Sequence, residues 1–372
     1  MSNSEKTLPE LSESISRVKG LDKEALQKAR QRADSLVKPP GSLGRLEEIA
    51  VQLAGISGEV FYRPDKRCVV IMASDNGVVE EGVASAPQSV THTQTLNFIK
   101  GITGVAVLAK AYNAGLMVAD LGINADVDYR AILNRKIRKS TRNIAKGPAM
   151  SREEAERAVM TGIELAARAV HEGNKMLGAG EMGIGNTTTT AAVLCALTGA
   201  APAQAAGKGA GLKEEAYRHK LGVIETALRV NAPDSSDPID CLAKVGGFDI
   251  AALAGLYIGG AISRVPVVID GFISMVAALA AYKLCPLARD YMIPSHASFE
   301  QGFSRAAEAL GVEPYLNLNM RLGEGSGCPI MFGVIDAACA VLRDMGTFEE
   351  ASIGEEYIDA VKEGDNFTVV SQ

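Results

Sequence analysis

Short apolar runs rich in Val, Ile and Met alternate with longer Ala-rich segments of helical periodicity through the centre of the chain. This alternation is typical of βαβ units and predicts an α/β fold with a mostly parallel sheet flanked by helices. Five runs are predicted strands, at residues 67–73, 115–122, 174–180, 265–270 and 290–295. Polar residues or glycine follow each run, and in open α/β sheets ligands bind beyond the carboxyl ends of the strands.

The two ends of the chain have a different pattern. The first sixty residues are strongly helical apart from one Pro-Pro-Gly break, and the last seventy are also mainly helical. We therefore predict a large α/β domain over residues 62–300 and a small helical domain built from residues 1–61 and 301–372. The Ala- and Gly-rich segment 249–264 is expected to be a buried crossover helix or a helix at an oligomer interface.

Composition and charge exclude several classes of protein. The net charge is −6 and no cluster of Lys and Arg is interleaved with aromatic residues, so nothing indicates a nucleic-acid partner. The polar N-terminus is not typical of a signal peptide, and no apolar stretch is long enough to predict a membrane span, so we expect a cytoplasmic protein. Six widely spaced cysteines without metal-ligand spacing are interpreted as small buried hydrophobes: Cys68, Cys195, Cys241, Cys285, Cys328 and Cys339.

A glycine pattern at residues 178–183 is the first candidate site. Gly178, Gly180 and Gly183 spell G-x-G-x-x-G between a predicted strand and a predicted helix, as a dinucleotide-binding fingerprint requires. However, no acidic residue follows about 20 residues later to hold a ribose hydroxyl, since the next acid is Glu214. Instead an Asn and four threonines follow, and these donors at a helix start suit a phosphate. The alternative is a well-capped structural helix after a tight turn.

Two glutamates lie between glycines. Glu181 is placed inside the glycine turn, where it contacts another part of a substrate or is an exposed loop acid. Glu324 follows Gly323 in a Gly-Glu-Gly-Ser-Gly sequence, which leaves the carboxylate accessible and the backbone free to approach a ligand. Such a carboxyl in an apolar cleft can serve as a general base. The alternative is a surface turn with an incidental acid.

Further polar groups follow the predicted strands. Asp75, Asn76 and Gly77 come after residues 67–73, and we expect them at the same sheet edge as the glycine pattern. His296 and Ser298 follow residues 290–295, without the sequence order of a hydrolase triad.

Eight stretches resemble, in order, the nicotinate-nucleotide:dimethylbenzimidazole phosphoribosyltransferase family, which activates the lower-ligand base of cobamides. They are KPPGSLGRLE (38–47), SDNGVVEEGV (74–83), GITGVAVL (101–108), GEMGIGNTT (180–188), KVGGFD (244–249), DGFIS (270–274), IPSHAS (293–298) and MRLGEGSG (320–327). The resemblance implies transfer of 5-phosphoribosyl from nicotinate mononucleotide to a small aromatic base, giving nicotinate and an α-riboside phosphate. It also implies a Rossmann-like domain with a small helical lobe, a dimer, and neither metal nor cofactor.

The same resemblance assigns residues to roles. It implies that Glu324 is the general base. The implied nucleotide-binding residues are Gly183, Gly185, Asn186, Thr187, Thr188, Lys220, Gly325, Ser326 and Gly327. The implied pocket for the base is formed by Glu181, Met182, Ala86, Gln94 and Leu322.

Alternatives remain at this point. One branch of the family is heterodimeric and accepts phenol or p-cresol, so the base is either dimethylbenzimidazole or a phenolic compound, and the assembly is either a homodimer or a heterodimer. A second hypothesis is a weakly or non-catalytic partner subunit of such a heterodimer. A third, a nicotinamide-dependent oxidoreductase, is disfavoured by the missing acid downstream of the glycine pattern.

Overall fold

One parallel sheet forms the centre of the computed structural model, which describes residues 11–128, 130–207 and 213–354. The strand order is β3-β2-β1-β4-β5-β6, and every pairing is parallel. This is the strand order of a Rossmann-type doubly wound sheet. The strands are β1 (Arg67–Ser74), β2 (Gly115–Gly122), β3 (Leu133–Asn134), β4 (Met176–Met182), β5 (Val267–Ile269) and β6 (Met292–Pro294). The five predicted strands are confirmed, whereas the two-residue β3 was not predicted.

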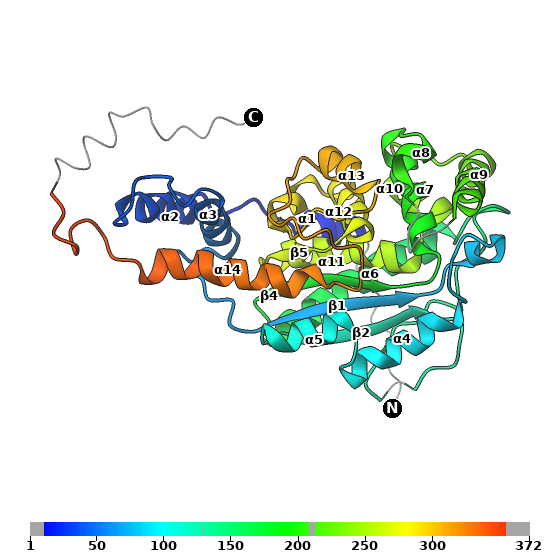
Figure 1. The fold of residues 1–372 in the computed structure, drawn as a ribbon, viewed down its shortest axis with the longest axis horizontal. Helices are drawn as coiled ribbons and strands as arrows, with labels where there is room; N and C mark the ends of the chain where they lie inside the picture. Colours follow the sequence, from blue (N-terminus) through cyan, green and yellow to red (C-terminus); the bar gives the residue numbers. More distant parts are fainter. Residues whose placement is uncertain (1–10, 129, 208–212, 355–372) are drawn as a thin grey trace. The chain divides into compact units, whose positions relative to one another are not determined.

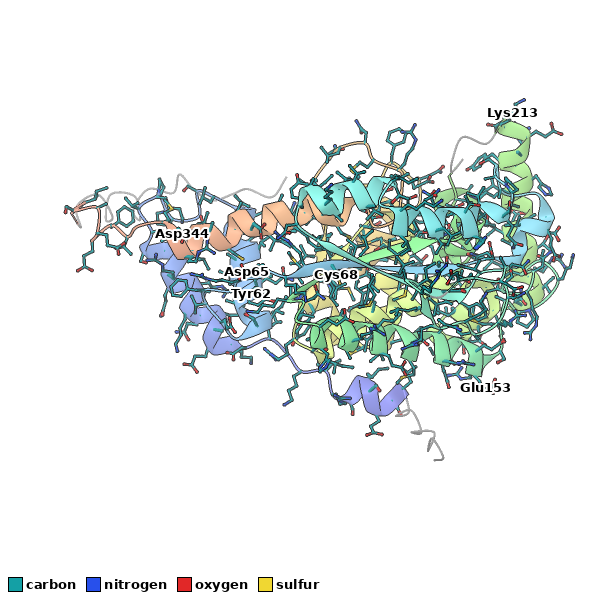
Figure 2. The ribbon with its side chains drawn as sticks, turned by 90° about the horizontal axis from the view of Figure 1, so that it is seen from below. Tyr62, Asp65, Cys68, Glu153, Lys213 and Asp344 are labelled. Atoms are coloured by element: carbon teal, nitrogen blue, oxygen red, sulfur yellow. The ribbon has the colours of Figure 1, made fainter. Side chains whose placement is uncertain are left out.

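Helices cover both faces of this sheet (Figure 1). Helices α4 (Ser89–Lys100) and α5 (Gly104–Ala111) lie on one face, and α6 (Arg152–His171) and α11 (Phe248–Ile262) lie on the other. Figure 2 shows the three layers edge on, with cyan α4 and α5 on one side of the strands and green α6 and yellow α11 on the other. Strands β1 and β4 are buried almost throughout, as expected for a sheet covered on both faces.

Small residues bring α6 and α11 into close contact. All residues of α11 from Phe248 to Ala261 are buried, which confirms the interpretation of segment 249–264 as a buried crossover helix. A Cβ added at Gly162 of α6 would overlap the carbonyl oxygen of Ala252, and one at Gly255 would overlap that of Val159. The absence of side chains at these positions lets the two backbones approach.

The chain divides into two compact units. The larger unit contains the described residues up to Lys19 and those from Lys66 to Met331. It therefore includes α1 (Leu11–Ser16) and α13 (Phe303–Leu310), which the predicted boundaries assign to the small domain. Its remaining elements are α7 (Asn186–Thr198), α8 (Pro202–Ala205), α9 (Glu214–Asn231), α10 (Pro238–Val245), α12 (Phe272–Leu284), η1 (Gly77–Glu81) and η2 (Pro286–Tyr291).

The smaller unit contains residues Gly20–Asp65 and the described residues from Phe332 onward. It holds α2 (Lys23–Ser35), α3 (Arg45–Ser57) and most of α14 (Gly327–Asp344). The Arg32 side chain donates to the carbonyl oxygens of Leu342 at 3.0 Å and Met345 at 2.8 Å, which joins the N-terminal and C-terminal segments. Between α2 and α3, the buried ammonium of Lys38 lies 2.8 Å from the Glu47 carboxylate, within the KPPGSLGRLE stretch.

All six cysteines are buried free thiols, which confirms the interpretation of these residues as small core hydrophobes. None of the described helices has both the length and the apolar character needed to cross a membrane.

Candidate active site

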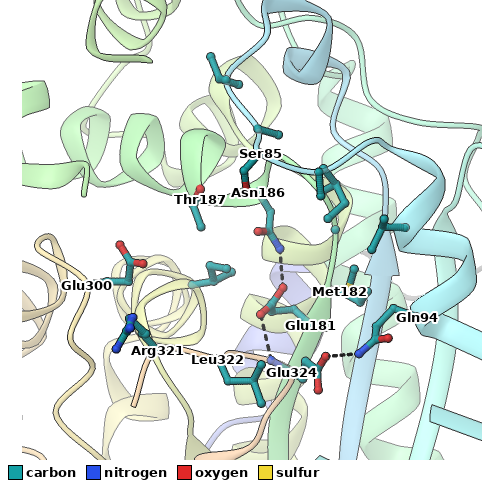
Figure 3. Close-up of a pocket in the computed structure, with 18 of the residues that line it drawn as sticks. Ser85, Gln94, Glu181, Met182, Asn186, Thr187, Glu300, Arg321, Leu322 and Glu324 are labelled. Atoms are coloured by element: carbon teal, nitrogen blue, oxygen red, sulfur yellow. Dashed lines mark hydrogen bonds between the residues drawn. The ribbon is translucent and has the colours of Figure 1, made fainter. Parts of the chain in front are cut away.

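A cavity of about 420 Å³ opens at the carboxyl ends of β1 and β4, within the larger unit. These two strands are neighbours, with Met72 paired with Glu181 and Ala73 with Met182, and the strand order reverses direction between them. Doubly wound sheets bind ligands at this position, because the loops after the two strands diverge to opposite sides. Figure 3 shows Glu181 between Asn186 and Glu324 among the lining residues, with Met182 beside it.

The glycine pattern differs from the predicted turn. Strand β4 continues through Glu181 and Met182, so the placement of Glu181 inside a glycine turn was wrong. Gly178 and Gly180 lie within the strand, in agreement with the predicted strand 174–180, and the turn begins only at Gly183. A residue without a side chain is needed at position 180 because the Glu324 loop approaches the strand there. A Cβ at Gly180 would lie 2.7 Å from the Glu324 carbonyl oxygen.

Glu324 presents a carboxylate to the cavity. Its Oε1 accepts a hydrogen bond of 2.6 Å from the Gln94 amide on α4, and Asn97 donates in turn to the Gln94 carbonyl oxygen at 3.3 Å. Its Oε2 is buried and accepts no hydrogen bond of ordinary geometry from the described residues. Burial raises the pKa of Glu324, and hydrogen bonds from the Gln94 amide and the Val105 N–H oppose this effect. The carboxylate is therefore more basic than that of an ordinary glutamate.

The start of α7 forms the opposite end of the cavity. Gly183, Gly185, Asn186 and Thr187 all line it. The Lys220 ammonium of α9 donates to the Thr187 hydroxyl at 3.0 Å, although Lys220 is only 1% exposed. Burial lowers the pKa of this ammonium to about 8, against an opposing effect of Glu300. A helix N-terminus beside a buried ammonium favours an anion such as a phosphate.

Two buried carboxyl groups share one amide beneath this helix start. The Asn186 side-chain amide donates to Glu181 Oε2 and, at 3.2 Å, to Asp249 Oδ2. Burial, followed by the charge of Asp249, raises the pKa of Glu181 to about 8. Burial also raises the pKa of Asp249 to about 7. Glu181 is therefore largely protonated near pH 7 and does not repel a neighbouring phosphate.

The structure brings together most of the predicted site residues. Glu324, Gln94, Ala86, Glu181, Met182 and Leu322 line the same cavity as Lys220 and the start of α7. Four predicted nucleotide-binding residues do not line it and lie buried behind its wall: Thr188, Gly325, Ser326 and Gly327. The N–H groups of Gly325 and Gly327 donate hydrogen bonds to the Asp270 carboxylate and are therefore directed away from the cavity.

The Asp75–Gly77 segment lies beside the glycine pattern, as predicted. The side-chain Oδ1 of Asn76 accepts a hydrogen bond of 3.1 Å from the Thr189 hydroxyl, and a Cβ at Gly183 would contact the side-chain Nδ2 of Asn76 at 2.9 Å. Asn76 is fully buried, so its role here is to join the end of β1 to the start of α7.

Sequence reasoning did not identify several residues of the site. Ser85, Glu300 and Arg321 line the cavity (Figure 3). Arg321 precedes the Glu324 loop and could have been found as the cation of the MRLGEGSG stretch, whereas Ser85 and Glu300 carry no such signal. A smaller adjoining cavity of about 50 Å³ contains His296 and Ser298.

The described residues contain no group of three or more His, Cys, Asp or Glu side chains arranged to hold a metal ion.

Known proteins similar to this chain are phosphoribosyltransferases. A family model described as "Phosphoribosyltransferase" matches residues 18–353. The nicotinate-nucleotide--dimethylbenzimidazole phosphoribosyltransferase of Clostridium perfringens is 52% identical over 360 residues, which cover 97% of this chain and 100% of that protein. The enzyme of that name from Ruminiclostridium cellulolyticum is 53% identical, over 93% of this chain and 98% of its own length. A crystal structure of the Thermus thermophilus enzyme matches with a TM-score of 0.85 and 41% identity, over 90% of this chain and 99% of that one.

Proposed function

Because this chain belongs to the nicotinate-nucleotide--dimethylbenzimidazole phosphoribosyltransferase family, a family of pentosyltransferases, we propose that it transfers 5-phosphoribosyl from nicotinate mononucleotide to dimethylbenzimidazole. The products are nicotinate and an α-riboside phosphate. The observation that carries this proposal is the Glu324 carboxylate of raised pKa, which lines one cavity with the anion-favouring start of α7.

Glu324 is the general base in this proposal. Its carboxylate accepts the ring N–H proton of the incoming base, whose nitrogen then attacks the anomeric carbon of the ribose. The bond from that carbon to the pyridinium nitrogen breaks, and the bonding electrons return to nicotinate as a neutral ring nitrogen. The raised pKa of Glu324 suits this step, because a base works best when its pKa approaches the working pH.

The opposite end of the cavity is suited to the nucleotide. The Lys220 ammonium of α9 contacts the Thr187 hydroxyl at the start of α7. The ammonium supplies positive charge for a phosphate, and the hydroxyl and the helix N-terminus supply hydrogen-bond donors. Apolar walls between this end and Glu324 include Ala86, Met182 and Leu322, which suit a flat aromatic ring. Such an arrangement holds the base and the anomeric carbon close together, which converts a bimolecular reaction into a nearly unimolecular one.

Glu324→Gln tests the proposal, because it preserves the shape of the side chain and removes the proton acceptor. We expect turnover to fall by about 10² to 10⁴, while the dissociation constant for nicotinate mononucleotide stays nearly constant. The measurements are nicotinate release and calorimetric titration with the nucleotide. Glu308→Gln is the matched control, since Glu308 is an exposed residue of α13 and its side chain is 76% exposed. Near-normal turnover by Glu324→Gln would contradict the assigned role.

The identity of the base is tested with the same assay. We infer dimethylbenzimidazole from the names of the relatives, and phenol is the comparison substrate because a single acidic O–H can also be deprotonated by Glu324. A higher kcat/KM with phenol would shift the proposal to phenolic bases. If the purified chain turned over neither substrate until a related subunit was added, its independent activity would be disproved.

We also infer that the chain acts as a dimer. Large apolar side chains are exposed beside the Glu324 loop, with Ile102 66% exposed and Leu322 58% exposed. Leu322 lies against the start of α5, two residues after Ile102 in the sequence, because a Cβ at Gly104 would lie 2.6 Å from Leu322 Cδ2. Light scattering of the purified chain tests this inference, and a monomer at micromolar concentration would refute it.

A further inference from the structure

The loop that carries Glu324 has an unusual backbone. Gly323, Glu324 and Gly325 have φ angles of 82°, 63° and 85°, so three consecutive residues are left-handed. Glycine adopts this conformation readily, but a residue with a Cβ does so only when its surroundings hold it. The side chain whose position matters most for the proposed chemistry is therefore attached to a backbone that other residues must restrain.

Asp270 makes the closest contacts to this loop. Its Oδ1 accepts a hydrogen bond of 2.6 Å from the N–H of Gly327, and its Oδ2 accepts one of 3.0 Å from the N–H of Gly325. The N–H of Glu324 itself donates to Glu181 Oε1 at 3.3 Å. Two buried carboxyl groups thus hold the loop from behind, while the Glu324 side chain faces the cavity (Figure 3).

Asp270 is itself firmly anchored. It follows β5 directly, is 2% exposed, and donates its N–H to the Ser274 hydroxyl at 3.0 Å. The Ser274 hydroxyl is also hydrogen-bonded to the phenol of buried Tyr257 at 2.6 Å. The backbone of Asp270 is therefore fixed to the sheet and to α12. Its carboxylate restrains the loop through two hydrogen bonds.

We propose that Asp270 is a positioning residue that holds the left-handed turn at Gly323–Gly325, so that the Glu324 carboxylate is directed into the cavity. Asp270 does not line the 420 Å³ cavity, although it lines the smaller adjoining one. Both of its oxygens accept hydrogen bonds from loop N–H groups, so it acts through Glu324. The inference rests on the proposed role of Glu324 as the general base.

Asp270→Asn tests the proposal with little change in size. The amide can accept one loop hydrogen bond, but its NH₂ group opposes the second N–H, so the turn should loosen. We expect kcat to fall by about 10-fold to 10²-fold, as for a displacement of an ångström or less, while the KM for nicotinate mononucleotide changes little. Because a reduced active fraction would also lower the apparent kcat at constant KM, kcat is expressed per active site, counted by calorimetric titration with the nucleotide. A loss that disappears after this correction would be a folding defect and would refute the positioning role.

A double-mutant cycle identifies the route of the effect. In a Glu324→Gln background, Asp270→Asn should lower kcat no further, because the group that it positions has lost its function. An equal loss in both backgrounds would overturn the positioning role, as would a normal kcat in the single Asp270→Asn variant. If Glu324→Gln alone kept its activity, the proposed function would fail, and this result is distinguishable from the other two.

Asp120→Asn is the matched control. Asp120 is likewise a buried aspartate near the end of a strand, where it accepts a hydrogen bond of 2.8 Å from the N–H of Ile123 and lies 3.1 Å from the Lys136 ammonium. We expect it to lower the melting temperature and to leave kcat of the folded protein unchanged. Should Asp270→Asn fail to fold, Ser274→Ala weakens the same anchor. It should lower kcat in the wild-type background only, and an unchanged kcat would refute the proposal.

Discussion

Gly180→Ala is a small perturbation directed at the contact between β4 and the Glu324 loop. The added Cβ would lie 2.7 Å from the Glu324 carbonyl oxygen and 3.1 Å from the Cγ1 atoms of Val69 and Ile71. The two aliphatic contacts are tight, but side chains can adjust slightly. The contact with the carbonyl oxygen cannot be relieved unless the loop backbone itself moves.

The magnitude follows from these distances. Ordinary contact begins near 3.4 Å, so the carbonyl oxygen must retreat by about 0.7 Å, the difference from 2.7 Å. Misplacement of a catalytic group by about 1 Å costs about 10²-fold in rate, so we expect kcat to fall by roughly 10-fold to 10²-fold. Overpacking of this kind also lowers the free energy of unfolding by about 1 to 3 kcal/mol.

The assay is steady-state nicotinate release, with kcat and KM for nicotinate mononucleotide determined separately and the melting temperature recorded in parallel. Gly222→Ala is the control, because Gly222 is an exposed residue of α9 with no heavy atom within 4 Å of an added Cβ. It should keep kcat and gain about 0.5 to 1 kcal/mol of stability from the better helix former. A Gly180→Ala variant with a lowered melting temperature but wild-type kcat would refute the inference that this contact sets the position of Glu324.

Three further predictions concern nucleotide binding, packing and pH. Lys220→Ala should raise the KM for nicotinate mononucleotide by about 10-fold or more through loss of a charge-assisted contact, and an unchanged KM would count against a phosphate at this ammonium. Gly162→Ala should lower the free energy of unfolding in urea by about 1 to 3 kcal/mol, because its Cβ would overlap the Ala252 carbonyl oxygen; wild-type stability would show that α6 and α11 can separate without cost. The pKa of Glu181 is raised from 4.5 to about 8, so between these values the folded chain holds a proton that the unfolded chain releases. The free energy of unfolding should therefore fall as pH rises through this range, by up to about 1.4 kcal/mol per pH unit from this group. In Glu181→Gln, the free energy of unfolding measured with urea should depend less steeply on pH. The same pH dependence in both proteins would disprove the assignment.

The sheet could be predicted because its strands are continuous apolar runs. β1, β2, β4, β5 and β6 all coincide with Val-, Ile- or Met-rich segments bounded by polar residues or glycine. Strands buried on both faces carry this signal whatever their neighbours are. β3 has two residues, Leu133 and Asn134, neither of them buried, and so short an element leaves no periodicity to detect. Pairing with β2 alone defines it.

The candidate site was predicted less completely, because several of its contacts join distant parts of the sequence. Glu324 and Lys220, which line the cavity, could be found from the family's motifs. Asp270 could not be assigned a role, because its partners at Gly325 and Gly327 are 55 and 57 residues away. The dimer implied by the resemblance stays a prediction.

The glycine pattern resembles a dinucleotide fingerprint because both require a backbone to approach closely, although the approaching groups differ. In the fingerprint, a pyrophosphate lies against the glycines at the helix start. Here Gly180 accommodates the Glu324 loop, and Gly183 accommodates Ser74, Asn76 and Asp249, which would contact an added Cβ. Gly180 and Gly183 therefore admit the Glu324 loop and the neighbouring strand ends, while Gly183, Gly185 and the start of α7 also line the cavity. It follows that replacing Gly180 should impair turnover before it impairs nucleotide binding, whereas the opposite order would be expected if the glycine contacted a dinucleotide.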